Sequence, residues 1–526
     1  MTTPDEYRRI SRVALGDLVH RAASRHGDRP AVVDGERRVS HRELDALSSQ
    51  FAHHLLGQRR GPHVATLCAN SIDVLVAIYG INMAGLVWVP INIALSPQQI
   101  GYILRHADVT CVVVDEDIIA RPEISAVLSN LETAVVISRP AGSSDHITVP
   151  TACSGSPSEL PDVEISGDQL ALIMYTSGTT GDPKGVMHSH SSAYSAVVAN
   201  VATLALTESD VMSAMLPLFH CAQHVLATST LAAGAAIVLT RGFDPAGMLR
   251  VIGDERLTIF GGLPMMYAAV LDQPAAPDTD LSSVRLCLYA MAPMPRPLID
   301  RIATAFGADV WLVTGQTEAY PITMRFEPLR HLALSANYWG VSTIVCETEI
   351  MDDEGRLLPP GEAGEIVHRG PNIMLGYYRD PDATAAAQAF GWHHTGDLGV
   401  IDAEGQLLFL DRKKDMIKTG GENVPSVKVE AVLLAHPAIA DAAVIGVPHP
   451  RWSEAVLAVA VLAPGQDVSP TDLLEHCRQR LAGFQVPKDI IFVSDLPHTA
   501  TGKIRKAVLR HDHEKHFAHA EARPDA

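Results

Sequence analysis

A polar segment at residues 175–185 carries the side chains that a polyphosphate site needs. It reads YTSGTTGDPKG, and its hydroxyl groups and glycines come from five successive residues: Ser177, Gly178, Thr179, Thr180 and Gly181. The glycines let backbone N–H groups approach a phosphate closely, and Lys184 adds a positive charge for the outer phosphates. It is not a Walker loop, because Pro183 precedes the lysine and no Ser or Thr follows it. Such a cluster alone is typical of a linker, but the strand-like run before it and the lysine after it favour a phosphate loop.

Four further segments combine charged residues with glycines. They are TGQTE (314–318), HTGDLG (394–399), DRKKDMIKTGGENV (411–424) and TATGKIRK (499–506). Together with the phosphate loop they resemble the signature of the adenylate-forming superfamily, which includes acyl-CoA synthetases, peptide-synthetase adenylation domains and firefly-type luciferases. The resemblance runs from about residue 166 to residue 510, and the chain looks most like the fatty-acyl and aryl-CoA ligases.

The resemblance implies a two-step reaction. A carboxylate attacks the α-phosphate of ATP, pyrophosphate leaves, and the acyl-adenylate passes its acyl group to a thiol, commonly that of CoA. Negative charge builds on the α-phosphate and on the leaving oxygen, so preorganised cations and hydrogen-bond donors should stabilise the first step. The implied substrates and cofactors are a carboxylic acid, ATP, Mg²⁺ and CoA.

By the same resemblance, individual residues take roles in this reaction. Thr179 and Glu318 would hold Mg²⁺, which prefers oxygen ligands. Asp397 would accept hydrogen bonds from the ribose hydroxyls, and Arg412 would donate to the ribose or a phosphate. Lys503 would bridge the reacting carboxylate and the α-phosphate.

The resemblance also implies further contacts and a moving part. The other nucleotide-binding positions would be Thr176, Ser177, Gly178, Thr180, Gly181, Lys184, Ala292, Pro293, Thr314, Gly315, Gln316 and Thr317. Gly420 and Gly421 would approach the pantetheine of CoA. The family rotates its C-terminal domain between the half-reactions, and the hinge would be Lys414, two residues after the motif arginine.

His220, in LPLFHCAQH, has two interpretations. It stands four residues before His224, so a helix could present both to a metal, but no acid stands beside them and no third ligand is evident. The resemblance instead favours a place in the acyl pocket or on the thiol route. The predicted acyl pocket comprises His220, Gly262, Met265 and Met291. Its apolar surroundings favour a fatty, aryl or polycyclic acid over an amino acid, whose ammonium would need an acidic partner.

Three segments depart from the family pattern. Ala290 and Met291 replace glycines that flank the adenine, and Thr314 stands where most relatives carry a tyrosine that stacks on it. In a third motif of the family, Trp339 contributes a bulky side chain. These departures have three interpretations: neutral drift within a permissive pocket, an acyl pocket reshaped for an unusual acid, or a weakened half-reaction.

The elements that must position these residues alternate between strands and helices, which predicts an α/β fold. We expect a large N-terminal domain over residues 1–411, built of layered α/β subdomains plus a small β-barrel. Turn signals at 352–355, 359–364 and 402–405 predict the hairpins of that barrel.

A small mobile α+β domain is predicted to follow over residues 412–526. Residues 427–436 suit a short helix and 440–462 suit strands. Ser469 and Pro470 predict the start of another helix, which Gly483 could close.

Composition limits the classes of function. The 526 residues include 41 Lys and Arg against 60 Asp and Glu, a net charge of −19, which disfavours a general nucleic-acid binder. Residues 412–526 hold 15 basic and 14 acidic residues, so the acidity belongs to residues 1–411 and phosphate recognition must be local. Seven scattered cysteines, an N-terminus without a signal-peptide pattern and the lack of a long apolar segment predict a cytoplasmic protein without an integral membrane segment.

Rival functions remain at this stage. The main prediction is an acyl-CoA ligase for an apolar acid. The first alternative is an acyl-AMP ligase that loads a carrier protein or performs one half-reaction, although no carrier domain is evident after Arg510. A non-catalytic nucleotide-binding regulator is a second, against which five retained site residues argue: Lys184, Glu318, Asp397, Arg412 and Lys503. A luciferase-like oxygenase would need a special substrate, and the sequence leaves open whether the chain forms a homodimer.

Overall fold

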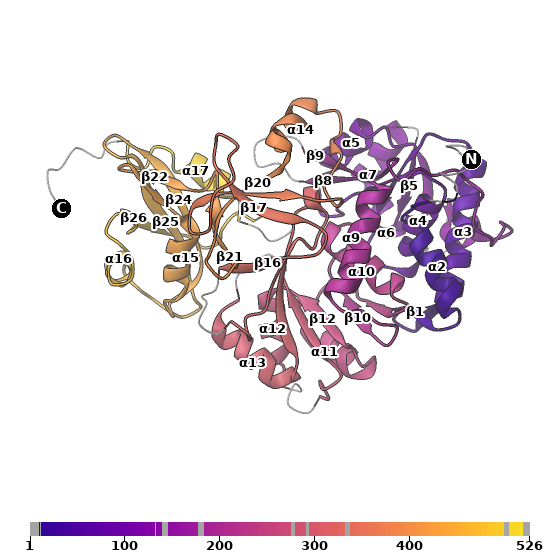
Figure 1. The fold of residues 1–526 in the computed structure, drawn as a ribbon, viewed down its shortest axis with the longest axis horizontal. Coiled ribbons are helices and arrows are strands. Elements are labelled where there is room, and N and C mark those ends of the chain that lie inside the picture. The colour runs from indigo at the N-terminus through magenta and orange to yellow at the C-terminus, as the bar shows by residue number, and fades with distance from the viewer. Residues whose placement is uncertain are drawn as a thin grey trace. The chain divides into compact units, whose positions relative to one another are not determined.

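Strands and helices alternate along most of the chain in the computed structural model (Figure 1). The structure describes residues 10, 12–131, 133–138, 146–176, 183–274, 279–290, 294–331, 337–498 and 504–518. The chain divides into two units, and the first comprises Met1–Ser177, Asp182–Thr348 and His368–His393. The second comprises Gly178–Gly181, Glu349–Val367 and His394–Ala526. The second unit contains all of the predicted small domain and additional residues before it, and the boundary at residue 412 stays a prediction.

One sheet of the first unit has a parallel centre. Its strands lie in the order β16 (Tyr338–Ser342), β15 (Met324–Phe326), β14 (Asp309–Thr314), β13 (Leu286–Tyr289), β12 (Ile259–Gly262), β10 (Val211–Ala214), β11 (Ala236–Leu239), β1 (Pro30–Asp34) and β2 (Arg37–Ser40). The pairs from β14 to β1 are parallel, and β15, β16 and β2 are antiparallel edges. Outer helices pack apolar side chains against it: α11 (Pro245–Asp254), α12 (Pro264–Leu271) and α13 (Arg296–Phe306).

A second sheet in this unit carries the phosphate-loop strands. Its order is β19 (Gly376–Tyr377), β9 (Lys184–Ser189), β8 (Leu170–Thr176), β4 (Val87–Pro90), β3 (His63–Leu67), β5 (Cys111–Val114), β6 (Ala134–Ile137) and β7 (Ile147–Thr148). The strand-like run before the phosphate loop is β8, so this part of the prediction is confirmed. Its outer face is covered by α5 (Pro97–His106), α6 (Glu116–Ile119) and α7 (Pro122–Asn130).

Helices fill the space between the two sheets. They are α2 (Asp17–His26), α3 (His41–Gln58), α4 (Ile72–Met83), α9 (His190–Thr203) and α10 (Cys221–Ala232), and they share one core with strands of both sheets. Every residue of α4 is buried, as expected for a helix that is apolar all round and covered on both sides. Short elements complete the unit: α8 (Val149–Cys153), the 3₁₀ turn η2 (Thr317–Ala319), α14 (Pro381–Ala387) and η3 (Ala389–Gly391). The predicted layered α/β architecture is confirmed.

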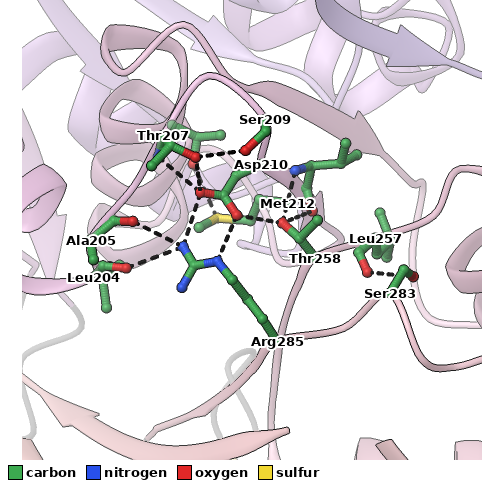
Figure 2. A network of polar contacts seen from close by, with 12 residues as sticks. Leu204, Ala205, Thr207, Ser209, Asp210, Met212, Leu257, Thr258, Ser283 and Arg285 are labelled. Atoms are coloured by element: carbon green, nitrogen blue, oxygen red, sulfur yellow. Dashed lines mark hydrogen bonds and ion pairs between the residues drawn. The ribbon is translucent and has the colours of Figure 1, made fainter.

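A polar network closes the N-terminal ends of the parallel strands (Figure 2). Asp210 directly precedes β10, Thr258 precedes β12 and Arg285 precedes β13. Arg285 donates to both carboxylate oxygens of Asp210, at 2.7 and 2.9 Å, and the Thr258 hydroxyl donates at 2.7 Å. Burial would raise the pKa of Asp210, but these hydrogen bonds hold it below its ordinary value. The network therefore joins three strand ends with a fully satisfied buried charge.

The second unit contains most of the hairpin strands. They are β17 (Glu347–Met351), β18 (Ala363–Arg369), β20 (His393–Ile401) and β21 (Leu407–Arg412), with turns at the predicted positions 352–355 and 402–405. Among the described residues these strands pair in the order β17-β18-β20-β21, and the small β-barrel stays a prediction. The hairpins were predictable because their turn residues are close together in the sequence.

A further sheet forms the C-terminal part of the second unit. Its strands are β23 (Glu422–Val424), β22 (Ile417–Thr419), β25 (Ser453–Leu462) and β24 (Ile439–His449), with β26 (Asp489–Phe492) pairing with β25. The helices are α15 (Ser426–Leu434), α16 (Pro470–Arg478) and α17 (Lys506–Asp512). Ser469 caps α16 as predicted, but the helix ends before Gln479, so Gly483 does not close it. Within the described residues, no helix combines the length and apolarity needed to cross a bilayer.

Candidate active site

The predicted site segments of the first unit follow the C-terminal ends of four adjacent parallel strands. β10 leads to His220, β12 to Met265, β13 to Ala290, and β14 to the TGQTE motif. Ligands of open α/β sheets bind beyond the carboxyl ends of their strands. The topology therefore gathers segments separated by about a hundred residues at one edge of the sheet.

The phosphate loop joins two antiparallel strands, β8 and β9. Thr176 pairs with Lys184 across the hairpin, so both predicted residues stand at its end. The Lys184 ammonium lies 4.9 Å from the centre of the Tyr377 ring and 4.0 Å from a carboxylate oxygen of Asp380. Its side chain is 47% exposed, so the charge remains accessible to a ligand. Other predicted residues lie outside the described residues: Ser177, Gly178, Thr179, Thr180, Gly181, Met291, Ala292, Pro293 and Lys503.

The TGQTE motif begins at the last residue of β14 and turns sharply. Thr314 is that last strand residue, and Gly315 has no room for a side chain because an added Cβ would lie 2.5 Å from the Cβ of Pro321. The Gln316 amide oxygen lies 3.2 Å from Nε2 of His393. Thr317 and Glu318 then form η2 with Ala319. Gly315 therefore allows the chain to pack against Pro321 at the sharp turn between β14 and Glu318.

Glu318 is held by a residue that sequence analysis did not identify. The Tyr377 hydroxyl donates to Oε1 of Glu318 at 3.0 Å, and the backbone N–H of Met374 donates to its carbonyl at 2.8 Å. Burial, followed by the nearby Glu318 charge, raises the pKa of Tyr377, so its hydroxyl stays protonated and donates. Because Lys184 contacts the same ring, Tyr377 brings together two predicted phosphate-site residues.

The Glu318 turn also receives hydrogen bonds from His188 and Asn372, which sequence analysis missed. Burial lowers the pKa of His188 to about 4, so its imidazole is neutral at pH 7. A carbonyl can only accept, so Nε2 carries the proton and donates to the Thr317 carbonyl at 2.7 Å. The Asn372 amide donates to the Ala319 carbonyl at 2.7 Å. No single-sequence pattern marks these contacts, which join distant segments.

Glu318 fits a magnesium site of the kind expected here. Mg²⁺ is usually held by one or two carboxylates together with substrate phosphates, and it prefers oxygen. Glu318 supplies such a carboxylate, while its predicted partner Thr179 lies outside the described residues. Among the described residues, no three His, Cys, Asp or Glu side chains are grouped for a metal. The Glu318 carboxylate therefore fits a metal ion that binds together with the phosphates of the nucleotide.

Only one of the two histidines lies within the helix. His220 is the N-cap of α10, whereas His224 lies within the helix, fully buried, with its Nδ1 2.5 Å from the Tyr320 hydroxyl. Burial lowers the pKa of His224 to about 3, so its ring is neutral. The described residues supply no third ligand, and the two-histidine metal interpretation gains no support.

Methionines surround the predicted acyl-pocket glycine. A Cβ on Gly262 would lie 2.8 Å from the Cε atom of Met215 and 3.6 Å from the side chain of Met266. Met265, at the start of α12, is 73% exposed. Flexible thioether side chains adapt to irregular apolar ligands. The described neighbours of Gly262 are therefore apolar, and the acyl pocket itself stays a prediction.

The second unit places Asp397 and Arg412 opposite each other. They are direct partners across the antiparallel pair β20–β21, and Arg412 Nε lies 3.8 Å from Asp397 Oδ1. Asp397 is buried, and its backbone N–H donates to the Thr395 hydroxyl at 3.1 Å. Two predicted nucleotide-binding residues are thus brought together by strand register.

The predicted hinge and pantetheine glycines follow β21. Lys414 lies in the turn between β21 and β22, where burial and then the charge of Arg412 lower its pKa. Gly420 and Gly421 form the two-residue loop between β22 and β23, with φ of +60° and +88°. Positive φ at both positions is the requirement of a type I′ hairpin turn, which explains the glycines structurally.

Comparisons with known proteins identify the family of the chain. The AMP-binding enzyme family model matches residues 19–378, and the model of its C-terminal domain matches residues 428–503. A feruloyl-CoA synthase of Amycolatopsis sp is 35% identical over 501 residues, covering 94% of this chain and 98% of the relative.

Two solved structures have the same fold. ATP-bound MatB from Rhodopseudomonas palustris aligns with a TM-score of 0.86 at 29% identity, covering 95% of this chain and 99% of its own. The o-succinylbenzoate CoA synthetase MenE from Bacillus subtilis, in complex with the acyl-adenylate OSB-AMP, gives a TM-score of 0.83 at 29% identity and covers 94% and 97%. The predicted superfamily, fold class and enzyme class, an AMP-forming acid–thiol ligase, are confirmed. The chain belongs to the AMP-binding enzyme family.

Proposed function

We propose that this chain activates an apolar carboxylic acid with ATP, through an acyl-adenylate, and transfers the acyl group to CoA. The observation that carries the proposal is the contact of both Lys184 and Glu318 with Tyr377 at the end of the phosphate hairpin. A cation and a carboxylate so close together suit a nucleotide that binds with a divalent metal.

Glu318 and Thr179 would hold Mg²⁺, which when bound neutralises charge on the phosphates. Lys184 would contact the outer phosphates, and Lys503 would donate to the α-phosphate and orient the attacking carboxylate. These groups act because they are already in place when charge develops in the transition state.

Residues of the second unit would serve ribose recognition and the second half-reaction. Asp397 would accept hydrogen bonds from both ribose hydroxyls, and Arg412 would donate to the ribose or a phosphate. Lys414 would absorb the backbone rotation between the half-reactions, with Gly420 and Gly421 next to the pantetheine.

An aromatic acid is the first substrate class to test. The methionine-lined wall at Gly262 supports an apolar acyl group, and the relative from Amycolatopsis sp is named for feruloyl-CoA. Fatty and polycyclic acids remain the other apolar classes. An amino acid would need an acidic partner for its ammonium group. Gly262 and Met215, which we assign to the acyl pocket, are uncharged and supply no such partner.

The test is pyrophosphate release with a panel of cinnamate-type, benzoate-type, fatty, polycyclic and amino acids, with and without CoA. We expect release with an apolar acid and formation of its CoA thioester and AMP. Release without any thioester would support the carrier-loading alternative, which would then be tested with phosphopantetheinylated carrier proteins. Failure to release pyrophosphate with every acid, while ATP still binds, would contradict the proposal and favour a nucleotide-binding regulator.

A further inference from the structure

Three donors from outside the Glu318 turn bind its three successive carbonyls. In chain order, the carbonyls of η2 accept from the His188 ring at 2.7 Å, from the backbone N–H of Met374 at 2.8 Å and from the Asn372 amide at 2.7 Å. A 3₁₀ turn of three residues has few internal hydrogen bonds and poor geometry in those it makes. Its conformation therefore depends on these outside donors.

The donors come from strand β9 and from the segment that leads into its paired strand β19. His188 lies in β9, which begins at Lys184, and Asn372 precedes β19. β19 is hydrogen-bonded to β9, with Tyr377 opposite Val186. Both His188 and Asn372 have side chains shielded from solvent, so their hydrogen bonds do not compete with water. The phosphate-loop strand and the Glu318 turn are thus parts of one connected framework.

Tyr377 adds a contact to the carboxylate itself. Its hydroxyl donates to one oxygen of Glu318 at 3.0 Å, and its ring faces the Lys184 ammonium at 4.9 Å. A buried tyrosine elsewhere shows the structural use of a hydroxyl: Tyr79 pairs with the Thr228 hydroxyl at 3.2 Å inside the core. Tyr377 differs because its partner is an ionisable side chain at the candidate site.

We propose that Tyr377 and His188 are positioning residues for Glu318: Tyr377 orients the carboxylate, and His188 fixes the turn that carries it. The inference rests on the proposed function, because it takes Glu318 as the carboxylate that meets the metal–nucleotide complex. Partners that orient a metal ligand through hydrogen bonds commonly contribute 10- to 100-fold to metal affinity or activity.

The first experiment compares Tyr377→Phe with the control Tyr79→Phe. Tyr377→Phe removes one oxygen atom and keeps the ring beneath Lys184. Isothermal titration calorimetry would measure the ATP dissociation constant with Mg²⁺ and with EDTA. The magnesium advantage is the ratio of the ATP dissociation constant in EDTA to that with Mg²⁺. We expect this ratio to fall by about 10-fold in Tyr377→Phe, while the dissociation constant in EDTA and the thermal midpoint stay unchanged. Tyr79→Phe should keep the wild-type advantage, although the thermal midpoint falls.

The second experiment uses two substitutions of His188. His188→Leu removes the donor, while His188→Gln places an amide N–H near the position of Nε2. We expect His188→Leu to lose magnesium-dependent ATP affinity by about 10-fold and His188→Gln to recover most of it. If His188→Leu fails to fold, His188→Gln and Tyr377→Phe still decide the proposal.

Glu318→Gln separates the two proposals. If it abolishes the magnesium advantage while Tyr377→Phe and His188→Leu retain that of the wild type, the positioning inference is overturned and the proposed function stands. If the wild-type protein shows no magnesium advantage and no acid-dependent pyrophosphate release, both are overturned.

Discussion

The two ends of the parallel strands differ in whether their charged side chains are buried and paired or remain accessible. At the N-terminal ends, Asp210 is 3% exposed and its carboxylate accepts from Arg285 and Thr258 (Figure 2). Beyond the C-terminal ends, Glu318 accepts from the Tyr377 hydroxyl, and half-exposed Lys184 has one ion pair at 4.0 Å. A closed network stabilises the fold, whereas charges left accessible can serve a ligand. The comparison predicts that one region controls stability and the other controls catalysis.

Arg285→Met tests the stability half of this comparison and has the largest expected effect. It leaves the buried Asp210 carboxylate without its cation, so the free energy of unfolding should fall by about 3 kcal/mol. Urea unfolding would measure it. Arg38→Met is the matched control, because the Arg38–Glu255 pair is exposed and should contribute under about 1 kcal/mol. Adenylation per folded molecule should not change in Arg285→Met, and a large loss there would break the comparison.

Glu318→Gln tests the catalytic half. The amide keeps the shape and removes the charge, so acid-dependent pyrophosphate release should fall about 10²- to 10³-fold. The free energy of unfolding should change by less than about 0.5 kcal/mol. Glu347→Gln, at an exposed pair with Arg369, is the control and should retain wild-type release. Equal rates in the two variants would count against a catalytic role for Glu318.

Lys414→Pro tests whether the second unit must rearrange between the half-reactions. Proline fixes φ and restricts the preceding residue, so thioester formation should slow about 10-fold while adenylation changes little. Rapid-quench measurements of pyrophosphate and thioester would separate the steps. Lys414→Ala keeps backbone freedom and should leave both near wild type. An equal loss in both steps would argue against a hinge at this position.

The smallest effect concerns pH and the Asp210 network. Because the folded pKa of Asp210 is depressed, its charge stabilises the fold above its ordinary unfolded pKa of about 4, and this contribution is lost as pH falls through the folded pKa. Asp210→Asn should therefore be less stable than wild type at pH 7, and the difference should shrink below about pH 4. Denaturant midpoints at pH 7, 5 and 3.5 would reveal it. A constant difference at every pH would show that the charge of Asp210 is not the cause.

The sequence predicted the local features more fully than the contacts between distant segments. The strand β8 before the phosphate loop, the turns at 352–355 and 402–405 and the Ser469 cap are signalled by residues close in the chain. β19 has two residues, too few to show a hydrophobic period, and it forms because β9 offers it an edge. Tyr377 and Asn372 therefore gave no signal, although they contact the predicted Glu318 turn.

The central claim is that the acid attacks the α-phosphate of ATP. An acid labelled with ¹⁸O in both carboxylate oxygens tests it directly, because the bridging oxygen of the acyl-adenylate stays with AMP when the thiol takes the acyl group. Mass spectrometry of the products should show AMP carrying one ¹⁸O, together with unlabelled pyrophosphate. Label in inorganic phosphate with ADP as the co-product, or unlabelled AMP beside the thioester, would contradict the account.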